Sequence, residues 1–168
     1  MQVVVCCSPD QKEELLAGGV STVDPVKYVD RLSNAVLSSD AEVIVDLLFA
    51  NDRERLQALV QTGKTIIINS VIHNLAEINA PFIRINAWPT FLCSSLMEAS
   101  GLSESSKGKT KQFLNLFKKQ PEWLPDDAGF ITPRIISMII NEAYFALSEG
   151  VSTKEEIDTV VQKLKELI

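Results

Sequence analysis

The amino-acid sequence predicts an α/β protein in which a parallel β-sheet has helices on both faces and is followed by a short all-helical region. Short apolar segments rich in Val and Ile alternate with segments of helical periodicity over about the first hundred residues. Strands that alternate with helices in this way form βαβ units, and such units build parallel sheets. We therefore predict an α/β domain over residues 1–102 and a helical region over residues 103–168.

Five segments of the first domain have the composition of β-strands. They cover residues 2–7, 20–23, 41–49, 65–69 and 82–86, and the second of these is the weakest. The others contain few polar positions, as expected of strands that are buried on both faces. Apolar residues at helical spacing lie between the strands and predict helices over residues 8–17, 26–36 and 56–63.

Two helices with well-marked ends finish the chain. The first has Thr132 as its expected N-cap, Pro133 at its first helical position and Gly150 just past its end. The second is expected to begin with a capping box over residues 152–155. A pair of helices buries little surface by itself, so their apolar faces need the α/β domain or another subunit to cover them.

The charge balance and hydropathy exclude several classes of function. The 168 residues carry 16 basic and 22 acidic side chains, a net charge of −6, and no basic stripe that could neutralise a run of phosphates. Nucleic acid is therefore not an expected partner. No apolar run approaches the roughly 20 residues that cross a bilayer, and the first residues lack a basic flank, so we expect a cytoplasmic protein.

Cysteine and histidine are too few and too scattered for a metal centre. Cys6 and Cys7 are adjacent and Cys93 is remote, which gives neither a Cys-x-x-Cys motif nor an even disulfide framework. We expect buried free thiols. His73 is the only histidine and has no second ligand at zinc spacing, so no metal is predicted.

The strongest motif is Asp127-Ala128-Gly129-Phe130-Ile131-Thr132-Pro133-Arg134, followed by Asn141-Glu142-Ala143, Glu149-Gly150 and Ile157-Asp158. This resembles the start of the C-terminal domain of 3-hydroxyacyl-CoA dehydrogenases, which reads Asp-x-Pro-Gly-Phe-Ile-x-Asn-Arg, then Asn-Glu-Ala, Glu-Gly and Ile-Asp. Upstream support comes from residues 41–49, from Asn69-Ser70, and from Pro89 followed by Leu96-Met97-Glu98. The resemblance covers roughly residues 41–160.

The resemblance implies a Rossmann-like NAD domain and oxidation of a 3-hydroxyacyl-CoA by a His–Glu acid/base pair. Such a domain needs a Gly-x-Gly-x-x-Gly turn after the first strand, because glycines let the diphosphate approach a helix N-terminus. Here that turn reads Cys6-Cys7-Ser8-Pro9-Asp10-Gln11. It holds no glycine, Pro9 lacks an N–H, and Asp10 would repel phosphate. NAD is therefore an open possibility rather than a predicted cofactor.

Most of the family's catalytic positions carry other residues in this chain. Alignment on Pro89 puts Ile85 at the position of the catalytic His and Trp88 at that of the following Asn. Neither side chain can accept the hydroxyl proton. The resemblance leaves Glu98 as the remaining member of the acid/base pair, and Asn86, next to the lost His, as a group that could hydrogen-bond a carbonyl.

Three further residues are candidate ligand-binding residues. Asp24 stands where the family's acidic ribose ligand is expected, although an Asp before Pro25 also suits a turn. Asn69 and Ser70 end a predicted strand, where open α/β sheets bind ligands, so they are candidates for substrate binding. Stabilisation of the loop explains the same two residues equally well.

Three functions follow from this pattern. The first is a catalytically degenerate relative of the dehydrogenases that acts as a dimeric binding or regulatory protein related to fatty acyl-CoA metabolism. The second is an active NAD-dependent oxidoreductase on a 3-hydroxyacyl-CoA or similar hydroxy acid. The third is a structural subunit that only dimerises. Losing both the phosphate turn and the catalytic base lowers the rate of hydride transfer by several orders of magnitude, which favours the first function.

We expect a homodimer through the C-terminal helices, with acyl-CoA or NAD as its candidate small ligands.

Overall fold

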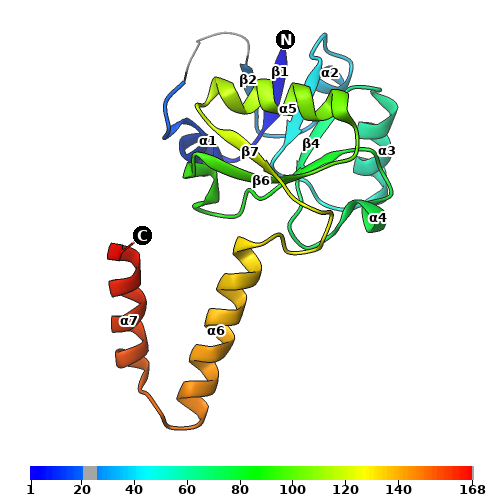
Figure 1. Ribbon diagram of the computed structural model, residues 1–168. Helices are drawn as coiled ribbons and strands as arrows, with labels where there is room; N and C mark the ends of the chain where they lie inside the picture. Colours follow the sequence, from blue (N-terminus) through cyan, green and yellow to red (C-terminus); the bar gives the residue numbers. More distant parts are fainter. Residues whose placement is uncertain (21–25, 168) are drawn as a thin grey trace. The chain divides into compact units, whose positions relative to one another are not determined.

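The computed structural model describes residues 1–20 and 26–167, with the side chains described up to residue 163 (Figure 1). The chain divides into two compact units, Met1–Phe130 and Ile131–Ile168. The composition of the sequence predicts an earlier start of the helical region, at residue 103. In the structure, residues 104–123 form a further helix and the last strand of the sheet, and so belong to the first unit.

The first unit is built on a seven-stranded sheet in the order β2-β1-β3-β4-β5-β6-β7. Neighbouring strands are parallel except β5 and β6, which are antiparallel. The bounds are β1 Val3–Cys6, β2 Val26–Val29, β3 Val43–Asp46, β4 Thr65–Asn69, β5 Ile83–Ile85, β6 Leu96–Ser100 and β7 Gln120–Trp123. The predicted Rossmann-like, mostly parallel sheet is confirmed.

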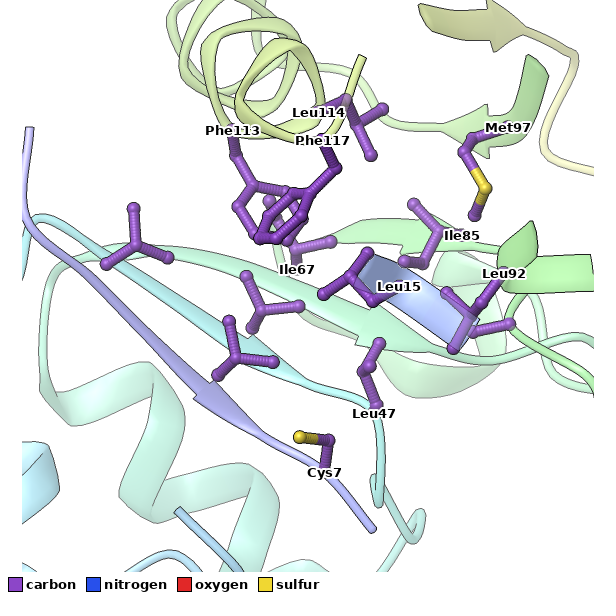
Figure 2. Packing of buried hydrophobic residues seen from close by; sticks show 14 of the residues in the cluster. Cys7, Leu15, Leu47, Ile67, Ile85, Leu92, Met97, Phe113, Leu114 and Phe117 are labelled. Carbon is purple, nitrogen blue, oxygen red and sulfur yellow. The ribbon is translucent and has the colours of Figure 1, made fainter. Parts of the chain in front are cut away.

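Helices cover both faces of this sheet, because successive side chains of a buried strand point to opposite sides. Val3 and Val5 pack on one side with Leu15 of α1 (Pro9–Leu16) and Phe113 of α5 (Glu104–Leu116), as Figure 2 shows for part of this cluster. Ile44, Ile66 and Ile68 face the other side. There they meet α3 (Arg53–Gln61) and α4 (Leu75–Ile78), while Val4 meets α2 (Asn34–Leu37).

The structure corrects the prediction for residues 20–36. Residues 26–29 form strand β2 rather than the start of a helix, and the helix that follows is only Asn34–Leu37. The segment Val-Lys-Tyr-Val is β-branched and aromatic, and its backbone completes a ladder along β1, which outweighs its helical spacing. Val20 is not in a strand, and residues 21–23 of the predicted strand lie outside the described residues.

Strands β6 and β7 are absent from the prediction because their sequences do not look like buried strands. Glu98 interrupts the first, and Pro121 lies in the second. A proline cannot donate to a ladder, so it is confined to edge strands, and β7 is the edge of this sheet.

The second unit consists of α6 (Thr132–Ser148) and α7 (Lys154–Leu167). Thr132 is the first helical residue rather than the N-cap, a shift of one position from the prediction. The capping box of α7 joins Thr153 and Glu156, through bonds from the Thr153 amide to Glu156 and from the Glu156 amide to Thr153 Oγ1, again one residue later than predicted. Among the described residues, no helix has the length and apolar character needed to span a membrane.

Candidate functional site

The turn after β1 lies at the switch point of the sheet, since the chain continues to β2 on one side of β1 and to β3 on the other. Open α/β sheets bind ligands in the crevice outside the carboxyl ends of the strands at this point. A dinucleotide's diphosphate would need free amides at the start of α1.

Two backbone amides at the start of α1 are used within the protein. The Gln11 amide donates to Ser8 Oγ at 3.1 Å, and the Ser8 amide donates to Gln11 Oε1 at 3.0 Å, which together make a capping box. Pro9 follows directly and has no N–H to offer. The start of α1 is therefore capped by its own side chains, and the arrangement does not fit a diphosphate.

Gln11 also bonds to the chain at the end of the neighbouring strand β3. Its Nε2 donates to the carbonyl of Leu47, just after β3, at 3.0 Å. Asn69 Nδ2 donates to the same carbonyl at 3.4 Å. Side chains from α1 and β4 thus converge on the backbone at the end of β3. Sequence reasoning missed Gln11, although Ser-x-x-Gln before an apolar run is a capping-box signature that could have identified it.

The segment after β5 packs onto α1. The Thr90 amide donates to Glu14 Oε1 at 2.9 Å, and Thr90 itself has a φ of 76°. Leu92, in the short helix η1 (Phe91–Cys93), is fully buried with Leu15 and Leu47 (Figure 2). An aliphatic side chain from the β5–β6 connection therefore reaches the layer between α1 and the end of β3.

The structure brings Asn86 and Glu98, the two candidate catalytic residues, together. Asn86 directly follows β5, and its Nδ2 donates to Glu98 Oε2 on the neighbouring β6 at 2.9 Å. The Asn86 amide also donates to the Glu98 carbonyl at 3.0 Å. Ile85 is buried in the main core cluster, so Asn86, rather than Ile85, is the residue of this strand end that faces the carboxylate.

Asn69 and Ser70 line a pocket of about 170 Å³ together with His73 and Trp88. Both also stabilise loops: Asn69 Oδ1 accepts from the Ala87 amide at 3.1 Å, and Ser70 Oγ donates to the His73 carbonyl at 2.8 Å. The pocket is smaller than the roughly 300 Å³ at which drug-sized ligand sites begin. Asp24, the candidate ribose ligand, lies outside the described residues.

A buried ion pair supports the end of β3 on the other face of the sheet. Arg55 donates to the fully buried Asp46 with Nε at 2.7 Å and a terminal nitrogen at 2.6 Å. Burial raises the pKa of Asp46, and the Arg55 guanidinium opposes that shift. Burial, with the Asp46 charge as the next contribution, raises the pKa of the adjacent Cys6 thiol from 9.0 to about 11. Cys6 is therefore a neutral thiol at physiological pH.

Part of the chain is similar in sequence to a family of dehydrogenases. Residues 129–165 match the sequence profile described as 3-hydroxyacyl-CoA dehydrogenase, C-terminal domain. No curated protein sequence matches at a significant level.

Solved structures with the same fold include several dehydrogenases. FadB2 of M. tuberculosis superposes with a TM-score of 0.73 at 14% identity, over 98% of this chain and 78% of FadB2. The 3-hydroxyacyl-CoA dehydrogenase of Archaeoglobus fulgidus gives 0.66 at 14% identity, over 96% and 68% of the two chains. The (S)-3-hydroxybutyryl-CoA dehydrogenase PaaH1 of Ralstonia eutropha gives 0.62 at 22% identity, over 78% of this chain and 50% of the enzyme.

At these identities the superpositions show a common fold, and the profile match adds the family's own C-terminal sequence pattern. The resemblance inferred from residues 127–158 is thereby confirmed: this chain has a 3-hydroxyacyl-CoA dehydrogenase-like fold and carries that family's C-terminal domain signature at residues 129–165.

Proposed function

We propose that this chain is a 3-hydroxyacyl-CoA dehydrogenase-like protein that does not transfer hydride, and that it acts in the cytoplasm as a homodimeric binding or regulatory protein related to fatty acyl-CoA metabolism. The capping box between Ser8 and Gln11 is the observation that carries the proposal, because it occupies two backbone amides at the start of α1, where a dinucleotide's diphosphate would bind.

The energetic cost of admitting NAD supports this reading. A diphosphate at the start of α1 would have to break the two capping bonds and compete with the Gln11 bridge to Leu47. Each such hydrogen bond contributes about 1 kcal/mol net. The Asp10 carboxylate in the first turn adds charge repulsion. The broken hydrogen bonds and the charge repulsion would both weaken the binding of NAD.

The chemistry at the end of β5 supports the same conclusion. Oxidation of a hydroxyl to a ketone needs a base that takes the O–H proton as hydride leaves. The carboxamide of Asn86 neither accepts nor releases a proton at neutral pH. Its bond to Glu98 makes an amide–carboxylate pair next to Ile85, the residue that alignment on Pro89 puts at the position of the family's catalytic His. Such a pair can still hold a ligand carbonyl or hydroxyl by hydrogen bonds.

The helical unit supports the dimer. Large apolar residues of α6 are exposed, with Met138 at 70%, Phe145 at 61% and Ile135 at 50% of their surface. Monomeric proteins seldom expose contiguous apolar patches of this kind, and a second copy of the same helix offers a matching surface.

Two measurements test the proposal on the full chain. Thermal unfolding with up to 5 mM NADH should show no shift. A cofactor present at 100 times its Kd would stabilise the protein by about 2.7 kcal/mol, so binding would be evident. Acetoacetyl-CoA with NADH should give no absorbance loss at 340 nm. A stabilising shift together with turnover that disappears in Glu98→Gln would establish the active-oxidoreductase alternative instead.

Sedimentation velocity tests the assembly separately. The wild-type chain should sediment as a dimer, and Met138→Glu should sediment as a monomer. Leu102→Glu is the matched control, since Leu102 is also an exposed apolar residue, at 84%, but lies in the first unit. A monomeric wild-type chain, or equal effects of the two variants, would contradict the dimer.

A further inference from the structure

Arg84 is a fully buried side chain on β5 that binds two separate loops. One terminal nitrogen donates to the carbonyls of Ser70 at 3.1 Å and His73 at 2.8 Å. The other donates to the carbonyl of Asp127 at 2.8 Å, and Nε lies 2.8 Å from Asp126 Oδ1 in an ion pair. A planar guanidinium can donate to these three carbonyls at once because its donors point in fixed directions, while its charge pairs with the Asp126 carboxylate.

The same two loops are also joined by bonds that do not involve Arg84. Asp126 Oδ2 accepts from the Leu75 amide at 2.7 Å, at the start of α4. The Gly129 amide donates to the Val71 carbonyl at 2.7 Å. Two hydrogen bonds donated by backbone amides, one to a side-chain carboxylate and one to a backbone carbonyl, therefore depend on the loops staying together.

The end of the second loop is held in an unfavourable backbone conformation. Gly129 has a φ of 88° and Phe130 a φ of 48°. The left-handed region suits glycine, but for a bulky residue it costs free energy and persists only where its surroundings impose it. The Phe130 ring lies 4.5 Å from the Arg84 guanidinium carbon, a cation–π contact that helps to hold this residue.

One of the two loops lines the pocket, and the other leads into the helical unit. Ser70, Val71 and His73 lie in the wall of the pocket described above. The segment Asp126–Phe130 is the last part of the first unit, and the helical unit starts at the next residue. We infer that Arg84 is a positioning residue that couples the pocket wall to the connection with the C-terminal helices, so that the two loops open and close as one cooperative unit. A ligand that orders residues 70–73 would then also order residues 126–130.

Amide hydrogen exchange on the full chain tests the coupling. The Leu75 and Gly129 amides report on the two ends of the contact, and Arg84 bonds to neither of them. In Arg84→Lys, we expect the protection factors of both amides to fall together by at least about tenfold, since even one hydrogen bond to a charged group contributes that much. A single ammonium group cannot reproduce the branched contacts of the guanidinium.

A matched control separates coupling from a general loss of stability. Lys64 is another cation that binds backbone carbonyls, those of Leu37 and Ser39, but in a different part of the first unit. Lys64→Met should leave the protection of Leu75 and Gly129 within about twofold of the wild-type values. Core amides of β1 and β4 measure the global stability in every variant.

The outcomes are distinct. Parallel loss at Leu75 and Gly129, larger than the loss at the core amides, supports the inference. A loss at only one amide, no loss at either, or a loss equal to that of the core would overturn it. Should Arg84→Lys not fold, Asp126→Asn removes the ion pair while keeping an acceptor for Leu75, and the same comparison at Gly129 decides.

Discussion

Replacing Gln11 probes the closed turn at the start of α1 directly. Gln11→Ala removes the bond to the Ser8 amide and the bond to the Leu47 carbonyl, while leaving the helix and its Ser8 cap in place. At about 1 kcal/mol for each bond, unfolding should become easier by about 2 kcal/mol. For a chain of this size that corresponds to a decrease in Tm of roughly 4 to 8 °C.

A second substitution separates the two bonds. Gln11→Glu keeps an oxygen that can accept from the Ser8 amide but loses the donor that reaches Leu47. It should therefore be destabilised through loss of the bridge alone, with added repulsion between its carboxylate and the carbonyl. Gln57→Ala, at an exposed glutamine of α3, is the control and should change stability by less than about 0.5 kcal/mol.

Urea unfolding followed by circular dichroism measures these differences, and an unchanged m-value shows that they reflect stability rather than a change in the unfolded state. The reasoning predicts the order wild type, Gln11→Glu, Gln11→Ala. If Gln11→Ala and Gln57→Ala had the same free energy of unfolding, the two side-chain bonds of Gln11 would contribute nothing to stability. The turn could then not be said to be held by these bonds.

Three further results are expected. Leu92→Ala should destabilise the protein by about 2 to 5 kcal/mol in urea unfolding, because it empties a fully buried site. Arg55→Met should cost about 3 to 5 kcal/mol, since it leaves the buried Asp46 carboxylate without its partner, and Asp46→Asn in the same chain should restore much of this loss. The Cys6 thiol ionises near pH 9.0 when unfolded and near 11 when folded, so stability should fall as the pH rises through this range. Replacing Cys6 with Ala should flatten that fall, and a slope that persists would contradict the assignment to Cys6.

The sequence predicted the central strands because their residues are apolar on both faces. Residues 43–46 and 65–69 lie within predicted strands, and both are flanked by helices as expected. At the edges of the sheet the pattern is weaker. Residues 26–29 carry a spacing that suits a helix and become a strand only through pairing with β1. Residues 120–123 contain a proline and gain strand geometry from β6.

The candidate site was predictable in its parts but not in its connections. The missing glycines, the surviving Glu98 and the polar end of β4 can all be read from the chain. The contact between Asn86 and Glu98 depends on an antiparallel pairing of β5 and β6 that no local pattern indicates. No local pattern marks the role of Arg84, a single charge in an apolar strand, because its partner Asp127 lies 43 positions away along the chain.

A ligand site on this fold leaves donors unpaired so that a ligand can take them, and glycines in a dinucleotide turn give up local stability for close approach. In the turn after β1, by contrast, the side chains of Ser8 and Gln11 stabilise the turn and use its donors. Ser8 caps the helix, Pro9 fits the first helical position, and Gln11 completes the box and bridges to Leu47. Local propensity and tertiary contact agree here, whereas functional sites are where they usually conflict. The region around Ser70 and Phe130 differs, because there a buried cation and strained backbone are concentrated. Ligand-dependent behaviour of this protein is therefore better sought in the pocket wall that Arg84 supports than at the start of α1.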